Sequence, residues 1–261
     1  MKAILTDTTL CIGCRECVMA CKKTYNLGEE VPRRWSSDDG LSSRNWTSII
    51  EKPDGKFIRK QCRHCLQPAC VSACPVGALT KTPEGAVIYD SKKCMGCRYC
   101  MMACPYGIPR YDWDQPVPYV RKCILCYDRI RQGGQPACTE ACPTQATIFG
   151  DRDELLAEAH HRIKDNPDRY INRVWGEKEI GGTQVLYISD IDLSCLTYGR
   201  ALGEKPLPSR TAPAMHAVPY AFVGVSATMA GISWIIGRRM KLQDKPEQKP
   251  TVGTSEEEND E

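Results

Sequence analysis

Sixteen of the 17 cysteines lie between residues 11 and 142, in four groups of four. The first and third groups, which begin at Cys11 and Cys94, have the spacing C-x2-C-x2-C-x3-C. The second and fourth, which begin at Cys62 and Cys123, lengthen one gap to four and to eleven residues, and every group ends in C-x3-C. A proline follows the last cysteine in three groups. This regular pattern restricts the chain to folds that bring four thiols together at each of several sites.

This spacing is that of the loops that bind [4Fe-4S] clusters in ferredoxins. Three thiolates two residues apart fit one tight loop and reach three corners of a cubane, so the fourth corner needs another chain segment. In two-cluster ferredoxins the last cysteine of each run ligates the other cluster, and the proline then turns the chain away. The sequence therefore predicts an α+β fold of two interlocked ferredoxin-like modules with four [4Fe-4S] clusters.

A disulfide scaffold and a zinc ribbon account less well for the cysteines. Disulfide scaffolds are short secreted domains, whereas this chain has 261 residues and its grouped cysteines end at residue 142. A zinc ribbon uses two C-x2-C pairs and has no use for a third cysteine followed by C-x3-C-P. Because the chain contains only three Phe, aromatic packing is thin, and we expect the cluster region to need its metal in order to fold.

Short elements are predicted between the cysteine groups. They are, in chain order, a strand over 1–6, a helical turn over 15–24, hairpins over 46–60 and 77–90, a helix over 151–163 and a buried strand over 181–189. Residues 26–61 form an insertion, whose Trp35 and Trp46 are expected to pack or to contact a partner. The motif CP-x-GA recurs in weaker forms after later groups, which indicates duplication of a module.

The C-terminal part of the chain has a different organisation. Residues 1–200 are expected to form the cluster domain, and residues 201–216 a proline-rich linker. Residues 217–237 are 21 residues without a charge, the length of a transmembrane helix. A buried soluble helix is the alternative, because serine and threonine lower its hydropathy. Residues 238–261 form a charged tail without apolar periodicity, which predicts disorder.

Several residues near these elements are not expected to bind metal. His160 and His161 belong to the solvated face of the predicted helix, and His216 precedes the apolar segment. Cys195 has no partner group and is interpreted as a packed free thiol. Nine basic residues flank the groups, either as solvated surface or to offset anionic clusters and raise their potentials: Arg15, Lys22, Lys23, Arg63, Lys92, Lys93, Arg98, Arg121 and Lys122.

Longer runs around the cysteines carry a family resemblance. They read KQCRHCLQPACVSACPVGAL, KKCMGCRYCMMACPYGIPRYDW, RKCILCYDRI and PACTEACPTQATIFGDRDELLAEA, and WGEKEIGGTQVLYIS follows them. From residue 1 to about 240 the chain resembles the four-cluster iron-sulfur subunits of membrane-bound oxidoreductases. The nearest types are the subunit of hydrogenase-2-type [NiFe]-hydrogenases and the β subunit of formate dehydrogenase. The resemblance implies a non-catalytic electron-transfer subunit between a catalytic subunit and a membrane cytochrome b or quinone-binding subunit.

The resemblance also implies how the cysteines are shared, because the family pairs the first group with the fourth and the second with the third. The implied ligand sets are the first set (Cys11, Cys14, Cys17, Cys142), the second set (Cys21, Cys123, Cys126, Cys138), the third set (Cys62, Cys65, Cys70, Cys104) and the fourth set (Cys74, Cys94, Cys97, Cys100). Four clusters held in this way would form a wire with one end at the catalytic subunit and the other at the membrane.

The chain ends bear on its location. Residues 1–10 run directly into Cys11, so the sequence predicts neither a signal peptide nor a twin-arginine motif. The resemblance to the formate dehydrogenase type then implies export beside a twin-arginine-tagged catalytic subunit. Five basic residues follow the apolar segment and three precede it, which favours a cluster domain on the periplasmic, outer face of the inner membrane. The cytoplasmic face is the alternative.

Further classes of function find less support in the sequence. It contains no nucleophile and base set, no phosphate-binding loop, no Rossmann fingerprint and no basic stripe for nucleic acid. The electron-transfer subunit of a quinol-linked molybdenum reductase, for dimethyl sulfoxide, polysulfide or nitrate, is the main alternative. A structural metal-binding or sensor protein is a weaker one. Cluster potentials range from about −700 to +450 mV with their surroundings, so the sequence does not set the direction of electron flow.

Overall fold

The computed structural model describes residues 1–28, 38–52, 54–116, 119–199 and 201–243. The chain divides into two compact units, Met1–Arg210 and Thr211–Glu261. Trp35 of the insertion, Pro53 of the first hairpin turn and most of the predicted charged tail lie outside the described residues.

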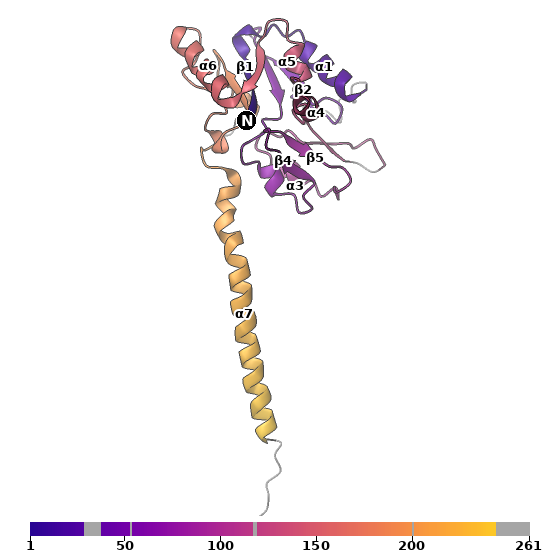
Figure 1. Ribbon diagram of the computed structural model, residues 1–261, viewed down its shortest axis with the longest axis vertical. Helices are drawn as coiled ribbons and strands as arrows, with labels where there is room; N and C mark the ends of the chain where they lie inside the picture. Colours follow the sequence, from indigo (N-terminus) through magenta and orange to yellow (C-terminus); the bar gives the residue numbers. More distant parts are fainter. Residues whose placement is uncertain (29–37, 53, 117–118, 200, 244–261) are drawn as a thin grey trace, which may run out of the picture. The chain divides into compact units, whose positions relative to one another are not determined.

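The first unit is built on a three-stranded sheet with the order β8-β1-β9 (Figure 1). The central strand β1 (Lys2–Asp7) pairs antiparallel with β8 (Thr147–Asp151) and parallel with β9 (Val185–Ile188). All four residues of β9 are buried, as expected for a strand covered on both faces. The predicted strands at the N-terminus and near residue 185 are thus confirmed, and they are neighbours.

The two faces of this sheet have different partners, because successive side chains of a strand point to opposite sides. Leu5 of β1 packs with Leu155 of α6 (Arg152–Asp165), which is the helix predicted over 151–163. Ile4, the preceding residue, lies in a core on the other face that includes Cys17. One face of the sheet therefore carries an ordinary apolar layer and the other carries cysteines.

Three antiparallel hairpins lie in the described part of the first unit. They pair β2 (Thr47–Glu51) with β3 (Phe57–Gln61), β4 (Leu79–Lys81) with β5 (Val87–Tyr89), and β6 (Arg110–Tyr111) with β7 (Val120–Arg121). The first two are the predicted hairpins. The third was not predicted, because strands of two residues are too short to show an alternation of apolar and polar residues.

Short helices follow the cysteine loops. They are α1 (Glu16–Tyr25), α2 (Ala69–Ser72), α3 (Tyr99–Ala103), α4 (Tyr127–Arg131) and α5 (Ala137–Glu140). The 3-10 turns are η1 (Thr8–Leu10), η3 (Glu179–Gly181) and η4 (Ser194–Thr197). In Figure 1, α1 and α5 lie on the side of β1 opposite α6. Helix α4 occupies the long gap of the fourth group, so the wider spacing accommodates an added helical turn.

Helix α7 (Leu207–Gln243) makes up most of the described second unit. It is long and apolar enough to cross a membrane, and it is the one helix of that kind in the described part of the chain. The sequence predicts a linker over 201–216, but the helix begins at Leu207 and continues through Pro213 and Pro219. Proline keeps a helical φ and removes one backbone hydrogen bond, so these prolines do not end the helix.

Candidate functional site

All 17 cysteines lie within the described residues, and all are free thiols. Within those residues, no group of three or more His, Cys, Asp or Glu side chains is placed to hold a single metal ion. A tetrahedral zinc site draws its four thiolates to about 2.3 Å from one ion. A cubane keeps its four thiolates farther apart than a single ion does, because each thiolate binds a different iron.

The four cysteines of the first set line one cavity. The antiparallel register of β1 and β8 pairs Thr6 with Thr147, so the loop after β1 and the loop before β8 meet at the same end of the sheet. Cys11 belongs to the first loop and Cys142 to the second. Pairing between the first and last parts of the motif region is what brings these thiols together.

The four cysteines of the second set line a second cavity. Cys21 lies on α1 and Cys138 on α5, and these two helices pack against each other. Burial raises the pKa of Cys21 to about 12, and the nearby thiols of Cys138 and Cys126 contribute to the rise. Such a thiol is costly to ionise in buried surroundings unless a metal compensates the charge.

The fourth set lines a third cavity, together with Leu79 and Val120. At Cys74 hydrogen bonds from backbone amides outweigh the effect of desolvation on the pKa. Burial alone would raise its pKa, but hydrogen bonds from the amides of Leu79, Val76, Ala78 and Gly77 lower it. The amide of Ala78, for example, lies 3.2 Å from the Cys74 sulfur. These amides are oriented to stabilise a thiolate.

The third set shares a buried region without a separate described cavity. Burial raises the pKa of Cys65 well above its ordinary value, and the thiols of Cys104, Cys62 and Cys70 contribute to the rise. Burial also raises the pKa of Cys70 to about 12 and that of Cys104 to about 11. All four thiols are therefore close neighbours inside the protein.

The cysteine loops share a backbone conformation. Gly13 and Arg15 of the first group have φ of 70° and 63°, and Gly96 and Arg98 of the third have φ of 74° and 63°. Positive φ turns the chain tightly enough for one loop to present several thiols, and glycine adopts it without strain. The repeated angles indicate that the two groups are copies of one loop, as the spacing predicts.

Contacts between sets give an order. Cys17 and Cys138 share one core cluster, Cys62 and Cys123 share a second, and Cys70 and Cys100 share a third. Burial raises the pKa of Cys123, and the thiols of Cys21 and Cys62 contribute to the rise. The sets therefore follow one another as first, second, third and fourth.

The structure divides the nine flanking basic residues into classes. Arg63 and Lys122 are buried, Lys22 and Arg121 are half-buried, and the other five are exposed. A further buried cation, Arg59 of β3, lines the cavities of both the first and the second set. Arg59 does not stand out in the sequence, because charged residues are ordinarily exposed. One feature of the sequence could have indicated that Arg59 is buried: it lies in the predicted hairpin, two residues from Gln61 and on the same face of the strand.

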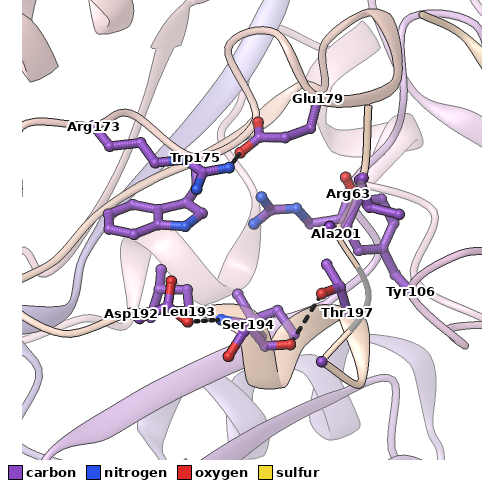
Figure 2. Close-up of a pocket in the computed structure, with 13 residues that line it drawn as sticks. Arg63, Tyr106, Arg173, Trp175, Glu179, Asp192, Leu193, Ser194, Thr197 and Ala201 are labelled. Carbon is purple, nitrogen blue, oxygen red and sulfur yellow. Dashed lines mark hydrogen bonds and ion pairs between the residues drawn. The ribbon is translucent and has the colours of Figure 1, made fainter. Parts of the chain in front are cut away.

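A larger cavity of about 390 Å³ contains no cysteine. Figure 2 shows the Arg63 guanidinium directed between Trp175 and the turn around Thr197. Above it Arg173 pairs with Glu179 at 2.7 Å, and the Arg63 guanidinium lies 4.2 Å from the centre of the Tyr187 ring. The cavity is thus distinct from the cysteine sets, although Arg63 lies beside the third of them.

The histidines that were not expected to bind metal are exposed, as predicted for His160 and His161 on a solvated helix face. His160 and His161 are exposed on α6 and lie near Glu177 and Asp165, at 3.3 and 3.1 Å. His216 is exposed on α7. Cys195 is half-buried, packs against the main core and lines none of the three cysteine cavities described above.

Comparison with known proteins agrees with this geometry. Two profiles, both described as 4Fe-4S dicluster domain, match residues 10–79 and 53–152. The Hydrogenase-2 operon protein HybA of Escherichia coli O157:H7 is 37% identical over 91% of this chain and 84% of its own length. The Formate dehydrogenase-O iron-sulfur subunit of Escherichia coli strain K12 is 36% identical over 87% of this chain and 80% of its own length.

A third relative is similar over a shorter part. The Probable anaerobic dimethyl sulfoxide reductase chain YnfG of Escherichia coli strain K12 is 39% identical over 57% of this chain and 73% of its own length. The sequence resemblance is therefore confirmed, and the cysteine-lined cavities fit the cofactor of these relatives. The chain belongs to the family of iron-sulfur electron-transfer subunits of oxidoreductases, which are non-catalytic and, here, carry four [4Fe-4S] clusters.

Proposed function

We propose that this chain connects a catalytic subunit of the [NiFe]-hydrogenase or formate dehydrogenase type with a membrane cytochrome b or quinone-binding subunit. The observation that carries the proposal is the lining of three separate cavities. Each is formed by three cysteines of one group and one cysteine of another. Such sharing is the arrangement of two-cluster ferredoxins, extended here to two modules. The names of two relatives refer to the hydrogenase-2 operon and to an iron-sulfur subunit of formate dehydrogenase-O.

In this proposal each of the four sets holds one [4Fe-4S] cluster, and bound clusters supply one-electron redox chemistry. The chain contributes the rest: thiolates that fix positions, amides that stabilise them, and apolar walls that exclude water. A linear order of the sets is supported by three neighbouring pairs of thiols from different sets: Cys17 and Cys138, Cys123 and Cys62, and Cys70 and Cys100. A linear order gives the complex one electron path with two ends.

Helix α7 is proposed as a single-pass anchor in the cytoplasmic membrane. Gly224, Ala227, Thr228 and Gly231 place small residues three and four positions apart, which suits close packing against another membrane helix. More basic residues follow the apolar segment than precede it, so the cluster domain is assigned to the outer face. Protease treatment of spheroplasts tests the assignment: cleavage within residues 1–200 supports it, and protection of that region with an accessible C-terminus refutes it.

The test of the function is purification in mild detergent with metal analysis and mass spectrometry of the proteins that accompany the chain. About sixteen irons per chain with nickel and a hydrogenase large subunit would establish the hydrogenase type. Molybdenum or tungsten with a pterin-binding subunit would indicate formate dehydrogenase or the reductase alternative, and substrate assays would separate these. Zinc in place of iron, without a partner, would refute the proposal.

A further inference from the structure

Arg59 lies between the cavities of the first and second sets. Its side chain lines both of them, together with Thr147 in one and with Gln61 in the other. Arg59 is only 2% exposed, so water does not screen its charge. Arg59 is the central residue of β3. Its backbone carbonyl accepts a hydrogen bond from the Tyr187 hydroxyl at 2.8 Å. The guanidinium therefore belongs to a rigid part of the core.

Hydrogen bonds from all three nitrogens fix the guanidinium. Nε donates to Thr47 Oγ1 at 3.1 Å, Nη1 donates to Thr147 Oγ1 at 2.9 Å, and Nη2 donates to Gln61 Oε1. All three acceptors are neutral, and no carboxylate among the described residues forms an ion pair with Arg59. An isolated buried cation is strongly unfavourable, so a negative charge must lie close by.

The neighbouring thiols supply that charge from both sides. Arg59 lines the first cavity together with Cys11, Cys14, Cys17 and Cys142. It lines the second cavity together with Cys21, Cys123, Cys126 and Cys138. Cluster ligands are thiolates, so one cation faces the anionic ligands of two different sets.

We propose that Arg59 is the shared counter-ion of the first and second cluster sites and raises the reduction potentials of both. The inference rests on the proposed ligand sets. Reduction adds negative charge to a site, and a fixed cation in a medium of low polarity favours the reduced form. Arg59 is absent from the lining of the fourth set's cavity. Other cations lie near the third set, among them Arg63, Lys81 and Lys122. The effect is thus confined to two of four clusters.

The test is a redox titration followed by electron paramagnetic resonance, on membranes from cells that produce the full chain with its partners. In Arg59→Gln, two of the four midpoint potentials should become more negative and two should stay unchanged. In Arg59→Lys, which keeps the charge, the same two should move less. Cys14→Ser and Cys97→Ser, which each change one set, assign the signals. If no potential moves in Arg59→Gln, or if all four move equally, the inference is wrong.

A second variant covers the case in which Arg59→Gln loses iron. Gln61→Glu keeps the acceptor for Arg59 Nη2 and neutralises the cation in place. The first and second clusters should again become more negative, and unchanged potentials would overturn the inference. As a matched buried cation, Lys122→Gln should leave the first cluster unchanged, since Lys122 bonds the carbonyls of Val87 and Cys123 instead.

The two proposals fail in different ways. If the wild-type chain lacks four cluster signals, the proposed function itself is wrong. If it has all four and Arg59→Gln leaves every potential unchanged, only the role of Arg59 is refuted.

Discussion

Lys60 Nζ lies 2.7 Å from the Asp39 carboxylate, and the two side chains are only 1% and 6% exposed. Arg110 Nη2 reaches the same carboxylate at 2.8 Å, and the Tyr198 hydroxyl donates to it at 2.9 Å. This buried network joins the insertion, β3, β6 and the turn after η4. It stabilises the first unit only while its anion is present, because the cations would otherwise be buried unpaired.

Asp39→Asn should therefore destabilise the protein strongly. Removing one partner of a buried ion pair costs about 3–5 kcal/mol of unfolding free energy. The control is Asp114→Asn, which breaks the more exposed pair with Arg44 and should cost at most about 1 kcal/mol. Denaturant unfolding of the cluster-loaded complex measures both. Equal losses in the two variants would contradict the importance of burial.

Cys142→Ser tests the sharing of cysteines between groups. Because Cys142 lines the cavity of Cys11, Cys14 and Cys17, its loss should alter the same cluster signal as Cys14→Ser does. The third and fourth sets should keep their signals and their iron. A change that instead matched Cys138→Ser would show that Cys142 serves the second set. Electron paramagnetic resonance of the three variants, with iron analysis, gives the answer.

Gly13→Ala should impair the first cluster site. Gly13 has φ of +70°, and a Cβ there would lie 2.5 Å from the Phe57 ring. Gly28 has φ of +68° with nothing within 4 Å, so Gly28→Ala carries the backbone penalty of about 1–2 kcal/mol alone. We expect Gly13→Ala to lose the first cluster signal and Gly28→Ala to retain it. Similar iron contents in both would mean that the loop adapts to the clash.

Cys195→Ala should leave the cofactor content unchanged. Cys195 is half-buried against the main core and lines none of the three cysteine cavities, so its replacement is expected to remove packing and no ligand. We expect about sixteen irons per chain as in the wild type, and a loss of about 1 kcal/mol of stability. A loss of about four irons, measured by colorimetric iron analysis, would make Cys195 a ligand.

Met229→Lys tests the proposed anchoring role of α7. Met229 lies in the uncharged segment, and a lysine at the centre of a membrane helix costs about 2.5–3.5 kcal/mol. The variant should be extracted by alkaline carbonate more readily than the wild type. Lys241→Gln, near the helix end, serves as the control and should behave like the wild type. Equal extraction of Met229→Lys and wild type would argue against a membrane span.

The sequence predicted the elements that depend on residues close together in the chain. Cysteine spacing predicted the loops, and the alternation in β2 and β3 predicted a hairpin. The role of Arg59 could not be predicted in the same way, because the charge that balances it comes from residues far away in the chain. The start of α7 was placed too late, since the prolines that suggested a linker are compatible with a helix.

The pairing of β1 with β8 has a consequence for how the protein is made. In the proposed ligand assignment, the third and fourth sets are contained within residues 62–104, whereas the first and second sets enclose them in the sequence and need Cys142 and Cys138. During synthesis the inner half can receive its iron while the outer half still lacks its last thiols. The strand that completes the sheet, β9, leaves the ribosome later still. The outer half can therefore be finished only after translation has passed residue 188, which sets the earliest moment at which a complete subunit can join its partners.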